Sequence, residues 1–273
     1  MPRTSDEQEL IARVSKRYEL AQCTLLQEIE RAVCGCDYGG TSWATHDEVL
    51  DIGRRLDLAP GKRLLEVGAG AGWPALFLAH RSGCDVALTD LPLAGLQAAR
   101  ARAAADRPSG ACWVTVADGT ALPFRRGWFD AASHSDVLCC LAEKLAVLTA
   151  CHEAVRPGGR MVFSVILVAP GLSGAAYERA VAGGPPVVET AASYPTMLRQ
   201  AGWRLTDRVD LTDTFRASLR RMLDIEQARA TELSEVLGRD DVAAMLTRRR
   251  TMLGAVEDGL LRRQLYEAVR DDA

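Results

Sequence analysis

The sequence predicts an α/β fold built on a doubly wound, seven-stranded and mostly parallel sheet, with helical additions at the N-terminus and between strands six and seven. Two observations support this prediction. Short apolar runs alternate with helical patterns over residues 45–211, as in repeated strand–helix–strand units. The run 64–67 leads directly into a glycine turn and Pro74, a residue that suits the start of a helix. The 273 residues, 48% of them hydrophobic, are enough for one such domain with an elaboration.

The strands are expected where short apolar or alternating runs lie between turn signals. The last of them, 262–270, is ambiguous because propensity alone favours a helix there. We predict a strand, since a seven-stranded sheet needs it and its residues can alternate. The first strand begins near Arg63, and the others cover 85–90, 111–116, 129–134, 160–168, 203–211 and 262–270.

Capping boxes and helical spacing of apolar residues predict the helices. Ser5 with Gln8, and Thr45 with Glu48, fit the capping-box pattern. The segment 169–191 is rich in Gly, Ala and Pro, which predicts a long loop or lid. The expected helices are 5–33 (one long helix or two short ones), 45–56, one from Pro74, 93–105, most of 137–155, 193–201, and two amphipathic helices within 213–257.

These elements suggest three parts: a helical cap at 1–44, a core at 45–212, and a helical insertion followed by the last strand at 213–273. The apolar stripe through Tyr18 and the one through Phe215 and Met222 need a surface to cover. We expect both additions to close over the carboxyl ends of the strands, or to form a homodimer interface.

Composition argues against several classes of protein. A net charge of -3 is unlike that of a nucleic-acid-binding protein, which is usually basic. The N-terminus has no apolar signal-peptide core, and the longest apolar run, 161–170, is too short to span a bilayer. We therefore expect a cytoplasmic protein without nucleic-acid or membrane partners. The eight cysteines lack metal-binding spacing, so buried reduced thiols and no metal site are expected.

The residues that indicate a ligand-binding site are concentrated at the glycine turn after the first strand. Gly68, Gly70 and Gly72 follow Glu66 at alternate positions, and glycine lets the backbone approach a ligand that a Cβ would block. The helix that follows offers unpaired N–H groups. The spacing is not the G-x-G-x-x-G of a dinucleotide site, because position 73 is Trp. Glu66 would repel a pyrophosphate, whereas it suits a ligand with an ammonium group.

Further matches follow in chain order and carry a resemblance to a known family. Together with 66–72, the series resembles class I S-adenosylmethionine (SAM) methyltransferases, whose sheet is Rossmann-like. It is most similar to the small-molecule enzymes of the ubiquinone and menaquinone biosynthesis type. The matching segments are Asp90, 118–119, 122–124, 129–130, 156–159 and 194–203.

The resemblance implies where SAM is held. Glu66 would meet the methionine amino group, Asp90 the two ribose hydroxyls, and Asp118 the adenine amino group. Gly40 and Thr41 resemble a glycine–threonine turn of related N-methyltransferases that touches the cofactor. The remaining expected cofactor contacts are Gly68, Ala69, Gly70, Leu91, Gly119, Thr120, His134 and Ser135.

The resemblance implies transfer of a methyl group to a small, partly apolar acceptor, with S-adenosylhomocysteine (SAH) as the product. Such a displacement depends mainly on alignment, and a base is needed only for a protonated nucleophile. His134, where strand four ends, is the candidate base; Tyr18, Tyr38 and Trp43 are candidate acceptor contacts, although packing would also explain them. Whether the acceptor atom is O, N or C stays open.

Two other functions are considered. A non-catalytic SAM-binding protein would keep the same cofactor residues. A nicotinamide-dependent oxidoreductase is disfavoured by the glycine spacing and by Glu66. In the helical insertion, Glu226 and Gln227 are expected in solvent, although either could contact a substrate, and 248–250 is expected to be a solvated arginine face.

Overall fold

Seven strands form one mixed sheet in the order β3-β2-β1-β4-β5-β7-β6. The computed structural model describes residues 5–39 and 42–271, with side chains from residue 8 onward. β1 to β5 pair in parallel, and β7 lies antiparallel between β5 and β6. The predicted fold class and the seventh strand are confirmed. The strands are β1 (Arg63–Val67), β2 (Asp85–Asp90), β3 (Cys112–Val116), β4 (Phe129–Ser135), β5 (Val155–Val168), β6 (Trp203–Asp210) and β7 (Leu261–Arg270).

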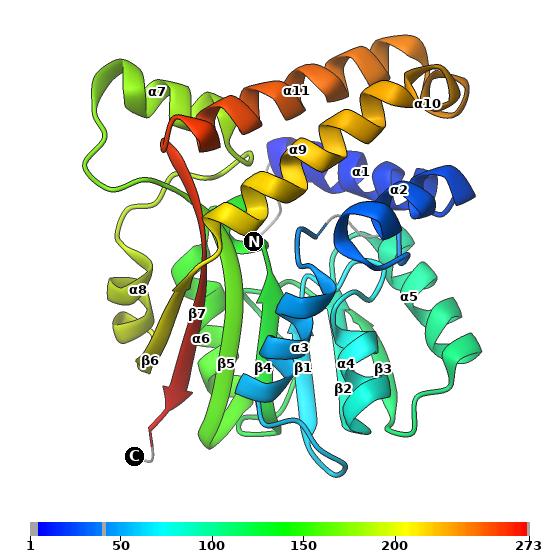
Figure 1. Cartoon of the computed structure of the whole chain (residues 1–273). Coiled ribbons are helices and arrows are strands. Elements are labelled where there is room, and N and C mark those ends of the chain that lie inside the picture. The colour runs from blue at the N-terminus through cyan, green and yellow to red at the C-terminus, as the bar shows by residue number, and fades with distance from the viewer. Residues whose placement is uncertain (1–4, 40–41, 272–273) are drawn as a thin grey trace.

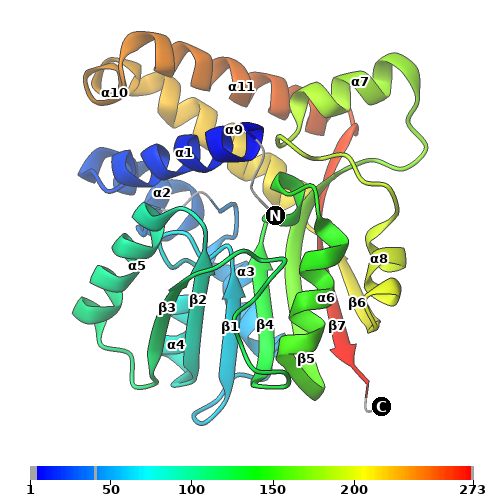
Figure 2. The same ribbon diagram turned by 180° about the vertical axis from the view of Figure 1, so that it is seen from behind.

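Helices cover both faces of this sheet (Figures 1 and 2). On one face α3, α4 and α5 pack on the apolar side chains of β1 and β2, and on the other face α6 and α8 pack against β5 and β6. The helices are α1 (Ser5–Leu20), α2 (Thr24–Cys34), α3 (His46–Arg55), α4 (Ala75–Ser82), α5 (Leu93–Asp106), the 3₁₀ helix η1 (Leu138–Cys140), α6 (Lys144–Ala154), α7 (Gly174–Gly183), α8 (Tyr194–Gln200), α9 (Thr212–Ala228), α10 (Ala230–Leu237) and α11 (Arg239–Glu257).

A layer formed by α1, α2, α9, α10 and α11 lies across the edge where the parallel strands end (Figure 1); we call this layer the roof. α2 contacts α9, α9 contacts α11, and α1 contacts α5 of the core. Apolar side chains of α9 and α11, such as Phe215, Leu219 and Leu246, continue the core cluster that begins under the sheet. The roof is therefore packed onto the edge of the sheet where the parallel strands end.

Several expected elements have different bounds. The segment 169–191 contains α7 instead of being a continuous loop, because its Gly-rich ends flank an Ala-rich stretch that packs on α11. The first of the two helices expected within 213–257 breaks at Arg229, and 137–155 contains η1 before α6 begins at Lys144. β5 begins at Val155 and not at Arg160 as expected, because residues 156–159 are part of the strand. The pairing of β5 with β4 shifts register between Phe129 and Ala131.

The N-terminal half of the chain follows its capping signals in part. The capping box of Thr45 and Glu48 is present at the start of α3, as predicted. The stretch 5–33 forms two helices, which is one of the two expected arrangements. The expected capping box of Ser5 and Gln8 depends on a side chain that lies outside the described residues.

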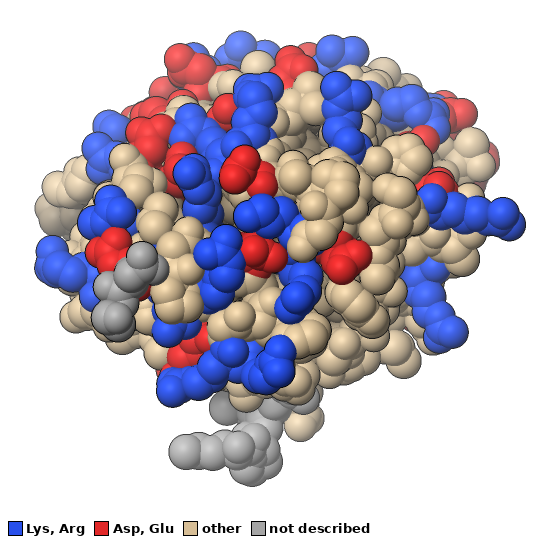
Figure 3. All heavy atoms as spheres, turned by 90° about the horizontal axis from the view of Figure 1, so that it is seen from below, with Lys and Arg blue, Asp and Glu red and all other residues tan. Residues whose placement is uncertain are grey.

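The surface mixes charges of both signs. On the face opposite the roof, basic and acidic side chains are interspersed (Figure 3). All eight cysteines are free thiols, and most of them are buried. Within residues 5–39 and 42–271, no helix is long and apolar enough to cross a membrane.

Candidate active site

The glycine turn after β1 has the backbone that its residues require. Gly68, Gly70 and Gly72 all have positive φ, at 70°, 50° and 102°. A Cβ on Gly70 would lie 2.6 Å from the hydroxyl of Tyr18, and a Cβ on Gly95 would lie 2.8 Å from the same ring. Tyr18 of α1 therefore packs directly against the turn, so the roof and the turn share one contact surface.

Glu66 lies buried at the end of β1, with 1% of its surface exposed. One carboxylate oxygen accepts a hydrogen bond from the hydroxyl of Ser133, its partner in register on β4. The other oxygen has no hydrogen-bond partner among the described residues. Burial raises the pKa of Glu66 to about 8. An unpaired buried acceptor of this kind is costly, and a bound ligand is one explanation for it.

Asp90 ends β2 and faces the same turn. Its carboxylate accepts hydrogen bonds from the N–H groups of Gly70 and Leu91, both at 2.8 Å. Burial raises the pKa of Asp90 to about 6. Ala69, between the two glycines, donates its N–H to the carbonyl of Thr89 at 2.9 Å, which ties the turn to β2. Each Asp90 oxygen keeps a lone pair that could accept a ligand hydroxyl.

Asp118 follows β3 and forms a local turn. Its carboxylate accepts hydrogen bonds from the N–H of Thr120 at 2.9 Å and from the Thr120 hydroxyl at 2.8 Å. Gly119 lies close to β1, because a Cβ there would be 3.0 Å from Val67. The parallel pairing of β1, β2 and β3 brings Glu66, Asp90 and Asp118 to one edge of the sheet.

His134 lies on the face of the sheet away from Glu66, since its neighbour Ser133 pairs with Glu66 and side chains alternate along a strand. The imidazole stacks on Phe163 at 4.5 Å, and neither ring nitrogen has a partner among the described residues. Burial lowers the pKa of His134 to about 3, so the ring is neutral. Ser135 next to it also has a buried, unpartnered hydroxyl in the described structure.

The three residues predicted to contact the acceptor lie in different environments. Tyr18 touches the glycine turn, as described above. Tyr38 packs on Trp73 at 5.3 Å under the guanidinium of Arg102, at 3.8 Å, within the N-terminal part of the fold. Trp43 meets Phe215 of α9 edge-to-face at 5.2 Å and so joins the N-terminal segment to the roof. Gly40 and Thr41 lie outside the described residues.

Comparison with known proteins decides the family. Residues 65–163, which begin in β1 and end within β5, match a model described as "Methyltransferase domain". The chain carries a class I SAM-dependent methyltransferase domain. The predicted family and SAM as the cofactor of this domain are thereby confirmed. The methyltransferase domain thus coincides with the strands that bear Glu66, Asp90 and Asp118.

Individual relatives extend the similarity beyond this segment. Methyltransferase GfsG of Streptomyces halstedii is 29% identical over 168 residues, which are 59% of this chain and 60% of GfsG. The structure of phosphoethanolamine N-methyltransferase 2 of Haemonchus contortus superposes with a TM-score of 0.76 at 18% identity, over 95% of this chain and 60% of that one. The [4+2]-cyclase SpnF has a TM-score of 0.73 at 21% identity, over 95% and 96% of the two chains. At these identities the structural likeness shows the fold.

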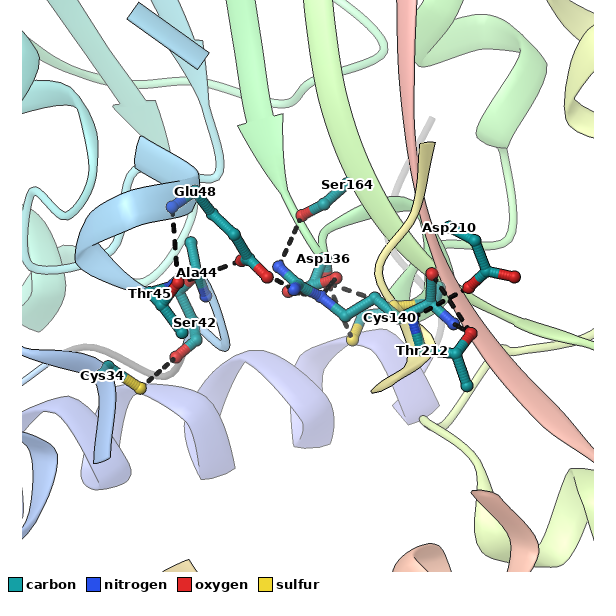
Figure 4. A network of polar contacts seen from close by, with 12 residues as sticks. Cys34, Ser42, Ala44, Thr45, Glu48, Asp136, Cys140, Ser164, Asp210 and Thr212 are labelled. Carbon is teal, nitrogen blue, oxygen red and sulfur yellow. Dashed lines mark hydrogen bonds and ion pairs between the residues drawn. The ribbon is translucent and has the colours of Figure 1, made fainter. Parts of the chain in front are cut away.

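Sequence reasoning missed a buried ion cluster beside the exit of β4. Three groups, the carboxylates of Glu48 and Asp136 and the hydroxyl of Ser164, converge on one guanidinium (Figure 4). It belongs to Arg263 of β7, which is fully buried and lies 2.8 Å from Glu48, 3.0 Å from Asp136 and 3.1 Å from Ser164. Asp136 has a φ of 57° in the turn that leaves β4 and does not begin the helix that follows.

A second charged pair lies in the roof, where the sequence suggested solvent. Glu226 of α9 is 3% exposed and contacts Arg249 of α11 at 3.3 Å. The Arg249 guanidinium lies 4.8 Å from the ring centre of Trp43. The prediction of exposure was wrong for both, because Glu226 continues the apolar spacing of Phe215 and Leu219. Arg249 likewise lies on the apolar stripe of α11, between Leu246 and Leu253. The helical spacing could therefore have predicted the burial of both charged residues.

Proposed function

We propose that this protein transfers a methyl group from SAM to a small, partly apolar acceptor. The observation that supports this most strongly is that Glu66, Asp90 and Asp118 lie at or just after the carboxyl ends of three adjacent parallel strands, and so share one sheet edge beside the glycine turn. In this proposal the free oxygen of Glu66 accepts from the ammonium group, Asp90 accepts from the ribose hydroxyls, and Asp118 accepts from the adenine amino group. Ligands of open α/β sheets bind at this edge.

The remaining predicted contacts complete the proposed cofactor site. Gly68, Ala69 and Gly70 would pass beneath the cofactor, Leu91 would lie beside the adenine, and Gly119 and Thr120 would flank its edge. His134 and Ser135 would lie nearest the sulfonium, and Gly40 and Thr41 are proposed to touch the carboxylate. Catalysis then rests mainly on alignment, which can contribute about 7–11 kcal/mol.

His134 is proposed as the base when the nucleophile arrives protonated. Burial holds its pKa at about 3, so the neutral ring has an unprotonated nitrogen but is a weak base, and this role requires the bound acceptor to raise that pKa. Tyr18, Tyr38 and Trp43 are proposed to shape the acceptor side, with Tyr18 best placed because it touches the glycine turn. An amine or carbon nucleophile would need no base from the protein.

Methyl transfer should be visible as conversion of SAM to SAH. We expect the purified protein to form SAH when it is incubated with SAM and a metabolite extract, and to form none without the extract. Mass spectrometry would then show a product that is heavier than its acceptor by the mass of one methylene. SAM binding without turnover under any extract would favour a non-catalytic SAM-binding protein, or another chemistry such as that of SpnF. Stabilisation by NAD and not by SAM would favour an oxidoreductase.

The pKa of Glu66 predicts a pH dependence of stability. Because the pKa is raised from 4.5 to about 8 in the folded protein, the native state binds more protons than the unfolded state between those values. The free energy of unfolding of the cofactor-free protein should therefore fall as the pH rises from 5 to 8. Urea denaturation at several pH values would measure this, and Glu66→Gln should flatten the profile. A wild-type profile as flat as that of Glu66→Gln would show that Glu66 is ionised at neutral pH.

The organisation of the chain is part of the proposal. Residues 1–44 would act as a cap, 45–212 as the cofactor core, and 213–273 as the insertion that completes the roof and the sheet. We further propose a cytoplasmic enzyme without nucleic-acid partners, supported by the net charge of -3 and the interspersed surface charges (Figure 3). A homodimer through the helical additions stays a prediction, which sedimentation velocity can test.

A further inference from the structure

The buried guanidinium of Arg263 connects two distant segments at the edge of the sheet where β4 ends (Figure 4). It lies 2.8 Å from a carboxylate oxygen of Glu48 on α3, and 3.0 and 3.1 Å from the two carboxylate oxygens of Asp136. Only 1% of the Arg263 side chain, 9% of Glu48 and 7% of Asp136 are exposed. Two carboxylates therefore share one cation away from solvent. Such an arrangement is costly to desolvate and is weak evidence for a purely stabilising role.

Asp136 has a backbone conformation that is uncommon for any residue other than glycine. Its φ is 57°, in the left-handed region. Its N–H donates to the carbonyl of Ser164 at 2.9 Å, and the Ser164 hydroxyl accepts a hydrogen bond from Arg263 at 3.1 Å. The backbone of Asp136 is thus fixed by β5 and its side chain by β7. Backbone strain of this kind persists only where the surrounding structure holds it, and it is concentrated at functional sites.

The turn that leaves β4 also contacts the glycine turn. Val137 follows Asp136, and a Cβ placed on Gly68 would lie only 2.5 Å from a methyl group of Val137. The absence of a side chain at Gly68 therefore lets Val137 pack onto the first glycine of the proposed cofactor site. A displacement of Asp136 would reach Gly68 through Val137. The contact of Arg263 with Glu48 leads instead to α3, where the same Glu48 oxygen accepts the N–H of Thr45.

We propose that Arg263 is a positioning residue for methyl transfer and that it acts through Asp136. Its guanidinium fixes the turn after β4, and the packing of Val137 on Gly68 then keeps the glycine turn in the shape that binds the cofactor. The inference rests on the proposed function, because it assigns a role in holding SAM. The two contacts of the guanidinium have different consequences: the one with Asp136 serves the cofactor site, and the one with Glu48 serves stability alone.

The test measures SAH affinity by calorimetry for the full-length protein and for variants that circular dichroism shows to be folded. Arg263→Met should weaken SAH binding at least tenfold. Asp136→Asn should weaken it severalfold, because asparagine tolerates a positive φ but lacks the charge that Arg263 holds. Glu48→Gln is the matched control. It alters the other contact of the same guanidinium and keeps the side-chain shape, so its SAH affinity should stay within twofold of the wild type, whatever its effect on the free energy of unfolding.

A double variant separates positioning from a general loss of stability. If Arg263 acts through Asp136, the combination of Arg263→Met with Asp136→Asn should bind SAH as weakly as Arg263→Met alone, and no more weakly. Wild-type SAH affinity in folded Arg263→Met, an equal loss in Glu48→Gln, or additive losses in the double variant would overturn the inference. Should Arg263→Met not fold, weaker SAH binding by Asp136→Asn than by Glu48→Gln supports the inference, and equal affinities overturn it.

The wild-type measurement distinguishes this inference from the proposed function. No SAH binding by the wild type would overturn both the positioning role and the proposed cofactor site. SAH binding by the wild type that none of the variants changes would overturn the positioning role only, and methyl transfer would stand.

Discussion

Arg263→Met should lower the free energy of unfolding by about 3–5 kcal/mol, because it leaves the buried carboxylates of Glu48 and Asp136 without their shared cation. Methionine keeps much of the apolar volume, so the loss reports the charge and not a large cavity. Arg263 joins β7 to α3 and to the turn after β4, and the substitution should therefore also loosen that turn. Urea denaturation measures the first effect directly.

A matched control is available at the protein surface. Arg204 pairs with Asp271 at 2.7 Å, but both side chains are more than half exposed. Arg204→Met should therefore cost about 0–1 kcal/mol. Similar losses for the two arginine variants would mean that the Arg263 cluster is solvated and does not hold the β4 exit in place.

Trp43→Ala should lower the free energy of unfolding by about 3–5 kcal/mol, because it removes a buried indole from the junction of the N-terminal segment and the roof. The indole contacts Phe215 of α9 and the guanidinium of Arg249. We expect SAM turnover to fall more than SAM affinity, because the roof covers the acceptor side while the cofactor residues lie on the sheet.

Trp43→Phe tests the same junction with a ring retained. It should recover most of the stability and part of the turnover, because a phenyl ring can still meet Phe215 edge-to-face. Thermal unfolding and SAH formation would be measured for both variants. A fully active and stable Trp43→Ala protein would show that the contact of the N-terminal segment with the roof contributes nothing to the site.

The strands were the most predictable part of the fold. Buried parallel strands appear in a sequence as apolar runs between turn signals, and 85–90 and 63–67 show this pattern clearly. The last strand was predicted against its helix propensity, and its pairing with both β5 and β6 explains how tertiary contacts override that propensity. The helix α7 was missed because glycines at its ends hid a short Ala-rich stretch.

The candidate site was predictable where it follows strand ends and unpredictable where it depends on contacts between distant segments. Glu66, Asp90 and Asp118 each lie within two residues of the carboxyl end of a strand, so topology alone brings them together. The cluster of Arg263 with Glu48 joins residues more than two hundred positions apart, and no local pattern encodes that contact. Glu226 was misplaced because its charge was given more weight than its position in the helical stripe.

Binding of SAH to Asp90→Ala tests the central claim most directly. The claim is that the cofactor lies on the edge formed by β1, β2 and β3, with Asp90 as the ribose ligand. Calorimetry should give one site of micromolar affinity, roughly 8 kcal/mol, for the wild type. Asp90→Ala should lose about 1.5–3 kcal/mol of it, while circular dichroism shows an intact fold. Unchanged SAH affinity in Asp90→Ala, or no binding by the wild type, would contradict the account.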